Sequence, residues 1–536
     1  NSIALGPNAT ATGLDSFTAG FNSEATATNA LALGSSAKAT AVGAYAAGLQ
    51  ATASGTNAMA FGSQATASSA DAWAAGYQAS ATGINATALG TGAQATAFDA
   101  FAAGVASSAT AANSIAFGTK ASANGIDSTA IGFLSNAASA NTIAIGTNAQ
   151  AVGSDSAAFG YGSVTTSAND LAIGTNAAAE GPFATAIGNN SNSIGADSMA
   201  IGVNAVAGGT NSLAIGRGAI ANGNNAFAIG VNAVADGDES FAFGDGARTS
   251  TNAAESLTAG DGAFAAGDES SAFGVNSKAL SENAYATGTQ AVAMGPNAHA
   301  LGTQSAATRN NAIALGTDST SRADEGIAIG TSAIAGTDSK AAMAMGDNSF
   351  AKEENAIAVG ANSIANGQNA YASGTASLAK GNNVIAIGAG ASAFGTSDQG
   401  FRQAFTSGPS GESAAELQIG QLLEGETSAE RRKRIDAAVS NGQNLISIGA
   451  NASAVGIGAS AIGASAISNG YQSMAIGQQA AASNTNATAL GVQANASGIN
   501  SMALGQDASS SNTNATALGV QANASGINSM ALGQDA

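Results

Sequence analysis

The sequence has little of what most folded proteins use for catalysis or for a thick core. Its 536 residues include no cysteine, one histidine, four prolines and 5% aromatic residues, and only 9% of them are charged. The absence of cysteine excludes thiolate metal sites, cysteine nucleophiles and the disulfides that staple many small secreted domains. Much of the 45% hydrophobic content is alanine, so apolar area must be buried in thin layers of small side chains.

The charge that is present has one dominant sign. Lys and Arg number 15 against 34 Asp and Glu, which gives a net charge of −19. A nucleic-acid partner needs a dense stripe of Lys and Arg, so none is expected. No apolar run is long enough for a transmembrane helix, and no signal-peptide pattern is visible. Because both ends fall inside a repeat, we interpret the sequence as a fragment and expect any membrane anchor outside it.

A glycine recurs with a fixed 14-residue period, starting at Gly6, Gly20 and Gly34. The spacing holds to Gly244, slips by two residues before Gly260 and again before Gly346, and resumes at Gly449 after a break. These landmark glycines define 35 units. A short fixed period of this kind indicates a solenoid.

Each unit reads roughly N-S-I-A-L-G-x-N-A-x-A-x-G, in which the side-chain character alternates as in a strand. We predict two short strands per unit, joined by turns at the Gly and Asn/Asp positions. Stacking each strand on its equivalent in the next unit gives an all-β fold, a parallel β-solenoid of 14-residue coils. At about 4.8 Å per coil, the units would extend over roughly 170 Å.

One face of the first strand carries only small residues. The position two before the landmark glycine is Ala in 32 of the 35 units, and the exceptions are Thr18, Thr258 and Ser447. We predict that this position and the glycine share a face that lies inside the coil, against the Ala residues of the second strand.

The opposite face of that strand is bulky. Positions three and one before the glycine usually compensate each other in volume, as in Trp73 with Ala75, whereas Phe227 with Ile229 and Phe241 with Phe243 break the rule. Such compensation is typical of a packed core. A hydrophobic stripe of this length needs a cover. Identical stripes on other copies in closed symmetry would supply it, and the pattern leaves two, three or four copies open. The residues assigned to this core are Phe17, Tyr45, Trp73, Phe101, Ile115, Phe117, Ile143, Ile145, Leu213, Ile215, His299, Met474, Met502 and Met530.

The motifs NSIALG (1–6), NSIAFG (113–118), NSLAIG (211–216) and NSMALG (500–505, 528–533) resemble the YadA-like head repeats of trimeric autotransporter adhesins, as does the 14-residue spacing. The resemblance covers the chain except for about residues 396–444. It implies a left-handed parallel β-roll, three chains per fibre, and display outside a bacterial outer membrane. A stalk and an anchor would then follow outside these residues.

The resemblance also implies a function in adhesion and virulence. Its expected partners are two further copies of the chain and an extracellular matrix protein such as collagen, a host cell or an abiotic surface. Contact with a membrane is expected only through the anchor, and no cofactor or metal is expected. Residues 113–118 and 211–216 match motifs linked to collagen, although the same strand also carries the predicted chain-to-chain stripe.

The 14-residue period stops between residues 396 and 444. SAAELQIGQLL (413–423) and SAERRKRIDAAVS (428–440) predict two short helices with Ser413 and Ser428 as N-caps. The expected domains are therefore a head β-roll over 1–395, a mainly helical insert over 396–444 and a second β-roll over 445–536. The basic run could contact a ligand, or it could be a solvated helix face on a spacer. This run consists of Arg431, Arg432, Lys433 and Arg434.

Two further features suggest sites. His299 occupies a bulky position of the stripe, where it could form a pH-sensitive or metal-binding ring of three imidazoles, or simply fill an aromatic slot. We favour the aromatic slot. Acidic residues gather at the predicted turns, where calcium is conceivable but a solvated edge is favoured. These residues are Asp236, Asp238, Glu239, Asp245, Asp261, Asp268 and Glu269.

Other classes of function fit less well. An enzyme on a solenoid would need a cluster of catalytic groups on adjacent coils, which one histidine and scattered acids do not supply. An ice-binding solenoid would need threonine at one outward position throughout, and ATAT at 9–12 and 25–28 is not continued. A structural spacer or a phage-type fibre, with binding located elsewhere, remains the alternative to an adhesin.

The end of the chain is a copy of the segment before it. SNTNATALGVQANASGINSMALGQDA at 483–508 recurs without change at 511–536, so the two copies are shifted by two coils. Because bulk alternates between coils, as in Phe17, Tyr45, Trp73 and Phe101, a copy of two coils keeps the alternation in phase. We conclude that length and repetition, rather than a single site, are what this chain supplies.

Overall fold

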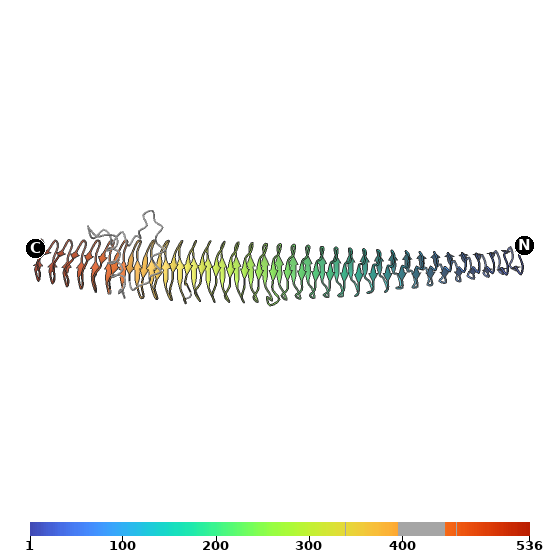
Figure 1. Cartoon of the computed structure of the whole chain (residues 1–536), viewed down its shortest axis with the longest axis horizontal. Coiled ribbons are helices and arrows are strands. Elements are labelled where there is room, and N and C mark those ends of the chain that lie inside the picture. Colours follow the sequence, from blue (N-terminus) through green and yellow to red (C-terminus); the bar gives the residue numbers. More distant parts are fainter. Residues whose placement is uncertain (338, 395–444, 457) are drawn as a thin grey trace, which may run out of the picture. The chain divides into compact units, whose positions relative to one another are not determined.

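The computed structural model describes residues 1–337, 339–394, 445–456 and 458–536. The chain divides into two units, Asn1–Gly262 and Ala263–Ala536. All regular elements within the described ranges are short β-strands, two to each coil (Figure 1). No helix capable of crossing a membrane is found among these residues.

The first strand of each coil ends directly before the landmark glycine, and the second strand follows four residues after it. In unit 1 the first strands are β1 (Ile3–Leu5), β3 (Phe17–Ala19), β5 (Leu31–Leu33), β7 (Tyr45–Ala47), β9 (Met59–Phe61), β11 (Trp73–Ala75), β13 (Thr87–Leu89), β15 (Phe101–Ala103), β17 (Ile115–Phe117), β19 (Thr129–Ile131), β21 (Ile143–Ile145), β23 (Ala157–Phe159), β25 (Leu171–Ile173), β27 (Thr185–Ile187), β29 (Met199–Ile201), β31 (Leu213–Ile215), β33 (Phe227–Ile229), β35 (Phe241–Phe243) and β37 (Leu257–Ala259). The second strands of unit 1 are β2 (Thr10–Ala11), β4 (Glu24–Ala25), β6 (Lys38–Ala39), β8 (Thr52–Ala53), β10 (Thr66–Ala67), β12 (Ser80–Ala81), β14 (Gln94–Ala95), β16 (Ser108–Ala109), β18 (Ser122–Ala123), β20 (Asn136–Ala137), β22 (Gln150–Ala151), β24 (Val164–Thr165), β26 (Ala178–Ala179), β28 (Asn192–Ser193), β30 (Val206–Ala207), β32 (Ile220–Ala221), β34 (Val234–Ala235) and β36 (Arg248–Thr249).

Unit 2 repeats the arrangement. Its first strands are β39 (Ser271–Phe273), β41 (Tyr285–Thr287), β43 (His299–Leu301), β45 (Ile313–Leu315), β47 (Ile327–Ile329), β49 (Met343–Met345), β51 (Ile357–Val359), β53 (Tyr371–Ser373), β55 (Ile385–Ile387), β57 (Ile446–Ile448), β59 (Ser460–Ile462), β61 (Met474–Ile476), β63 (Thr488–Leu490), β65 (Met502–Leu504), β67 (Thr516–Leu518) and β69 (Met530–Leu532). Its second strands are β38 (Phe264–Ala265), β40 (Lys278–Ala279), β42 (Val292–Ala293), β44 (Ala306–Ala307), β46 (Thr320–Ser321), β48 (Ile334–Ala335), β50 (Phe350–Ala351), β52 (Ile364–Asn366), β54 (Leu378–Lys380), β56 (Ser392–Phe394), β58 (Ser453–Val455), β60 (Ile467–Ser468), β62 (Ala481–Ala482), β64 (Asn495–Ala496), β66 (Ser509–Ser510) and β68 (Asn523–Ala524).

Within each unit, every strand pairs in parallel with its equivalent in the next coil. β21 pairs with β23 so that Ala144 lies beside Ala158, and β22 pairs with β24 so that Ala151 lies beside Thr165. Both pairings are offset by one full coil. The structure therefore confirms the predicted all-β fold, a parallel β-solenoid of 14-residue coils.

Four small side chains per coil fill the interior. In the coil of Gly146 they are Thr142, Ala144, Ala149 and Ala151, all completely buried. Where hydroxyls enter this layer, several bond to each other across it, as do Ser156 and Thr165 at 2.8 Å. The predicted alanine interior is confirmed. Some of its hydroxyls have partners, whereas others, such as those of Ser128 and Ser212, have none among the described residues.

The landmark glycine is required for a different reason from the one we expected, which was close approach to the opposing strand of the same coil. Gly146 adopts φ +137°, and a Cβ there would lie 2.3 Å from the carbonyl oxygen of Gly160 in the next coil. The glycine is therefore required by the contact between stacked coils and by its backbone conformation, and not by the opposing strand.

Two turn residues per coil adopt the left-handed conformation, one in each turn. Asn141, Asn148 and Asp155 show φ of 56°, 60° and 57° at successive turns. Asn and Asp tolerate this region better than other residues with a side chain. Their side chains also link coils, since the Asn141 amide donates to the Asp155 carboxylate at 2.8 Å.

Both slips of the period lie in the second turn, the one that leads from the second strand into the next coil. The two extra residues fall between β36 and β37 and between β48 and β49, yet Phe241 still pairs with Leu257 and Ile327 with Met343. Residues 395–444 fall at the same point of the repeat, between β56 and β57, and the coils on either side stack in register, with Ile385 beside Ile446. The two predicted helices, 413–423 and 428–440, lie outside the described residues.

Asp170 is an exception in the interior, because it places a carboxylate at a position where other coils carry small residues or, at Val384 and Leu445, larger apolar ones. Its side chain is 1% exposed, and its carboxylate accepts hydrogen bonds from the backbone N–H groups of Ser167, at 2.7 Å, and Ala184, at 3.1 Å. Burial raises the pKa of Asp170, and these backbone bonds only partly oppose the rise.

A substitution pair tests the thin interior. Ala179→Leu should lower the free energy of unfolding by about 3 kcal/mol, because the buried Ala179 has no room for three more carbons. Ala178→Leu, one residue earlier on the outward side of β26, should change it by less than about 0.5 kcal/mol. Chemical denaturation followed by circular dichroism measures both, and equal effects would contradict the assigned interior.

Asp170 predicts a pH dependence of stability. A raised pKa means that the folded chain holds this proton to higher pH than the unfolded chain, so stability falls as pH rises from the ordinary value of 3.8 through the raised one. Asp170→Ser should remove that loss, so its advantage over the wild type should grow with pH across this interval. Asp155→Ser, on an exposed turn, serves as control. Parallel denaturation profiles for wild type and Asp170→Ser would refute the assignment.

Candidate functional site

The first strands carry a continuous hydrophobic surface on their outward side, here called the stripe. It consists of the residues three and one before each landmark glycine. Trp73 is 39% exposed and Phe117 54% exposed in the single chain. Side chains of this kind left in water cost free energy, so the stripe is a surface in need of a partner.

The structure places every described residue of the predicted core on this stripe. Phe17, Tyr45, Trp73 and Phe101 lie on β3, β7, β11 and β15, in every second coil. The remaining members lie on β17, β21, β31, β43, β61, β65 and β69 and are half-buried or exposed: Ile115, Phe117, Ile143, Ile145, Leu213, Ile215, His299, Met474, Met502 and Met530. Whether they face other chains stays a prediction. Arg431, Arg432, Lys433 and Arg434 lie outside the described residues.

Aromatic rings on the stripe pack between successive coils. Tyr45 and Phe61 lie 4.8 Å apart between ring centroids, and Phe227 and Phe241 stack at 4.9 Å with planes 5° apart. Such pairs add stabilisation beyond the buried area. The Tyr45–Phe61 pair extends the volume compensation to neighbouring coils, because Phe61 lies beside the small Ala47. Phe227 and Phe241 are instead two large residues side by side.

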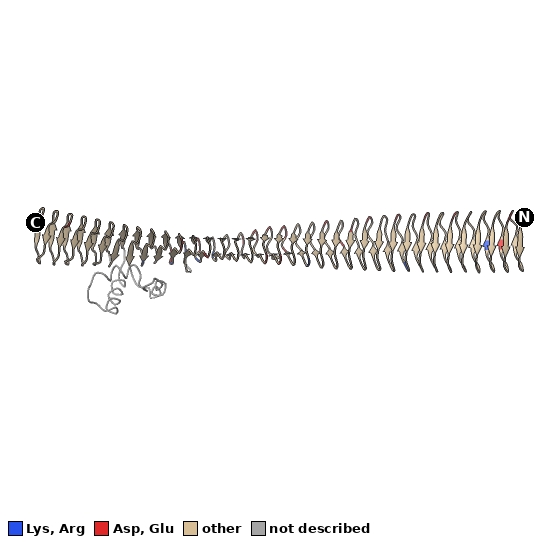
Figure 2. Cartoon of the chain, turned by 90° about the horizontal axis from the view of Figure 1, so that it is seen from above, with Lys and Arg blue, Asp and Glu red and all other residues tan. Residues whose placement is uncertain are grey.

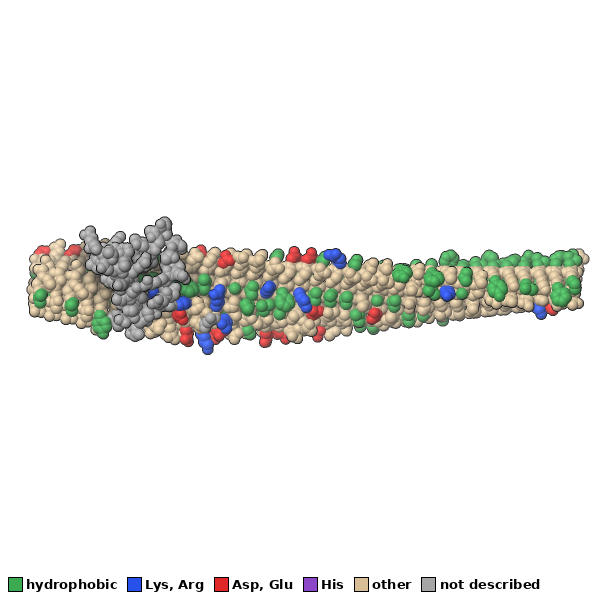
Figure 3. Space-filling model, viewed as in Figure 1, with side chains coloured by type: hydrophobic (Ala, Val, Ile, Leu, Met, Phe, Trp, Pro, Cys, Tyr) green, Lys and Arg blue, Asp and Glu red, His purple; other side chains and the backbone are tan. Residues whose placement is uncertain are grey.

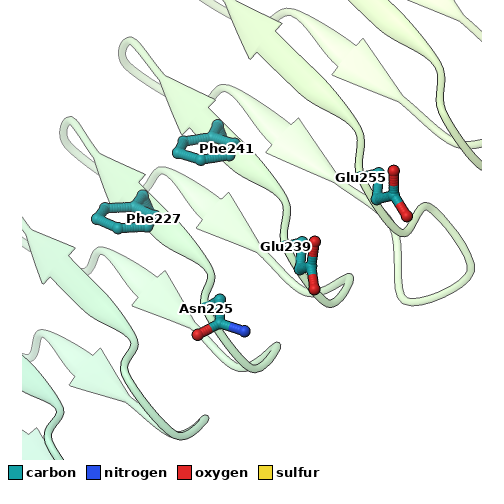
Figure 4. Close-up of a pocket in the computed structure, with 5 residues that line it drawn as sticks. All are labelled: Asn225, Phe227, Glu239, Phe241 and Glu255. Carbon is teal, nitrogen blue, oxygen red and sulfur yellow. The ribbon is translucent and has the colours of Figure 1, made fainter.

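A shallow depression of about 490 Å³ lies beside the Phe227–Phe241 pair. Figure 4 shows the two rings on adjacent first strands, with Asn225, Glu239 and Glu255 at the turns that precede successive first strands. All three turn residues have positive φ, from 52° to 55°. The depression lies between adjacent coils and is open to the stripe. The carboxylates of Glu239 and Glu255 at its rim do not by themselves form a binding site.

His299 continues an aromatic row on the stripe. Its ring centroid lies 6.1 Å from that of Tyr285, which in turn lies 5.7 Å from that of Phe273. The imidazole therefore occupies a position equivalent to an aromatic residue, in agreement with the interpretation we favoured. The place of His299 in the core between chains stays a prediction.

The acidic residues at the turns bond to the neighbouring coil. Asp238 accepts a hydrogen bond from the Asn224 N–H at 2.8 Å, and Asp245 accepts one from the Val231 N–H at 3.0 Å. Asp236 pairs with Arg248 at 3.7 Å. Within the described ranges, no three His, Cys, Asp or Glu side chains are grouped as metal ligands, and Figure 2 shows how little of the chain is charged.

Sequence analysis missed a second surface on the opposite side of the coil. The first residue of the second strand points outward, as does the residue two positions later, and these positions are here called the outer face. In the first coils the outer face is polar, with Thr10, Thr52 and Thr66. Later coils place Val206, Ile220 and Val234 there. A comparison of this one position from coil to coil would have revealed the change.

The comparisons with known proteins agree with this architecture. The family described as the YadA head domain repeat (2 copies) matches in overlapping segments, and a search of curated proteins found no match. The matches together cover residues 1–37, 39–93, 95–121, 123–191, 193–219, 221–247, 260–284, 286–333, 338–363, 365–391, 454–508 and 510–536. The chain belongs to the YadA head family. It is a YadA-like head domain of the kind found in trimeric autotransporter adhesins, a non-enzymatic family.

Proposed function

We propose that the chain forms the head of a homotrimeric adhesin fibre on the bacterial cell surface. The observation that carries this proposal is the stripe, which leaves large apolar side chains such as Trp73 and Phe117 exposed along both units. Three copies in closed symmetry cover three identical stripes at once, and membership of the YadA head family supports the number three.

Adhesion follows from repetition. The fibre presents nearly identical coils many times over, so weak contacts add up through avidity and no single residue need dominate. The proposed targets are an extracellular matrix protein such as collagen, a host cell or an abiotic surface, with a role in virulence. Display outside the outer membrane would depend on an anchor beyond these residues.

The proposed domain division keeps the two β-rolls, 1–395 and 445–536, with the insert 396–444 between them. The basic run of the insert, Arg431 to Arg434, remains a candidate ligand contact. A purely structural spacer is the competing function, and it differs from the adhesin in binding no surface.

The assembly is tested by charge placed on the stripe. Light scattering should give a mass about three times the 50.7 kDa of one chain. The double variant Ile143→Glu, Ile215→Glu should dissociate on dilution, because an uncompensated buried charge costs about 3–5 kcal/mol. The matched control Gln150→Glu, Ile220→Glu changes the outer strands β22 and β32 of the same coils and should stay assembled. A stable monomeric wild type would refute the proposal.

Adhesion is tested with immobilised collagen, cultured cells and plastic. The assembled chain should bind at least one of them with an apparent affinity about 100-fold or more above that of the dissociated double variant, because three chains bind together. The same assay without residues 396–444 shows whether the insert contributes. Absence of binding to every surface would favour the spacer.

A further inference from the structure

The outer face of unit 2 combines apolar and basic side chains over nine consecutive coils. Phe350 lies between Ile334 and Ile364 on paired strands, and all three are half-buried. Towards the start of the unit, Phe264, Lys278 and Val292 lie side by side on β38, β40 and β42. Met294, two residues after Val292, is 46% exposed.

The charge on this face is of one sign. Its two outward positions per coil, from Phe264 to Lys380, include Lys278, Arg322, Lys352 and Lys380 and no acidic residue. Lys352 pairs with Glu353 at the adjoining turn at 3.3 Å, while Lys278 and Arg322 are exposed. Acidic residues are rare at the outward positions of the second strands in both units, so the four basic side chains, and not the lack of acids, distinguish this stretch. Figure 3 shows hydrophobic and basic side chains gathered along the middle of the view.

The same positions are neutral and polar at the end of the unit. The second strands β64, β66 and β68 place Asn495, Ser509 and Asn523 on the outer face. The fold does not require apolar residues there, since these coils stack in the same register. The apolar and basic character over Phe264–Ile364 is therefore independent of the solenoid itself.

We propose that the outer face over Phe264–Ile364 is a docking surface for an anionic lipid membrane. The paired second strands present these side chains on one side of the coil. Half-exposed Phe, Ile, Val and Met side chains enter the boundary between headgroups and acyl chains, while Lys278 and Arg322 meet the lipid phosphates. An anionic polysaccharide matches only the charge, and a neutral apolar surface matches only the hydrophobic residues. A lipid membrane matches both.

This inference deepens the proposed adhesive function and rests on it, because it names one class of target. It departs from the expectation that a membrane is met only through an anchor. The inference is compatible with the proposed trimer. Side chains alternate between the interior and the outside along each strand, so the outward side chains of the first strands (the stripe) and of the second strands (the outer face) lie on opposite sides of the coil. Covering the stripe therefore leaves the outer face exposed.

The test is co-sedimentation of the full chain with vesicles made of equal parts of phosphatidylserine and phosphatidylcholine. The wild type should bind them and should not bind pure phosphatidylcholine vesicles. The variant Lys278→Glu, Arg322→Glu should bind at least about 10-fold more weakly, because each basic residue contributes about 1 kcal/mol near an anionic surface. Val292→Ser, Ile334→Ser should also weaken binding, which a purely ionic contact would not show. Asn495→Glu, Ser509→Glu, in the same register on the polar coils, should bind like the wild type.

Several outcomes would overturn the inference. They are no binding to anionic vesicles, equal binding by all variants, or heparin binding that Val292→Ser, Ile334→Ser leaves unchanged and that exceeds vesicle binding. If the outer-face variants dissociate in light scattering, the face joins copies of the chain instead. If they lose only vesicle binding and still attach to collagen, cells or plastic, the proposed adhesin stands on those targets. If vesicle binding fails while such attachment persists, only the inference falls.

Discussion

The stacking of each coil on the equivalent backbone of the next is the interaction on which the rest of the structure depends. Parallel pairing with an offset of one coil places every residue beside its counterpart, as with Ala144 and Ala158. Which side chain fits at a position therefore depends mainly on the residues at the same position in the coils before and after it. This explains why glycine recurs where coils approach most closely, and why Asn and Asp recur at the left-handed turns, where their side chains bond from coil to coil.

The interior of the coil is filled mainly by small residues, with Val384 and Leu445 as larger exceptions, so most large residues lie on its surface. The stripe and the outer face are the result, and they differ in kind. The stripe runs through both units with volumes adjusted between neighbours, as in a packed core. The outer face changes from hydroxyl-rich to apolar and back to polar along the sequence. A surface of constant character suits contact with copies of the same chain, whereas a surface that varies suits contacts confined to part of the fibre.

Much of the fold could be predicted because it is periodic. The glycine spacing defined the coil length, and the near-invariant Ala before the glycine identified the interior, including Thr18, Thr258 and Ser447 as its exceptions. The role of the glycine itself was harder to predict, because its contact is with the equivalent glycine of the next coil and depends on φ. The outer face was missed because a single unit shows nothing unusual at that position. Residues such as Asp170 also required the structure, since only its hydrogen bonds to Ser167 and Ala184 explain how a carboxylate is buried there.

Residues can be added at the second turn without adding a coil to the stack. The two extra residues before Leu257 and before Met343 add no coil and leave the strand register unchanged. The strands on either side of 395–444 also pair in register. Insertions at this turn can thus be accepted during evolution while the hydrogen bonds between stacked strands stay intact. Duplication of whole coils changes the length of the stack, whereas insertion at this turn changes the segments attached to it. The two kinds of variation can therefore evolve independently.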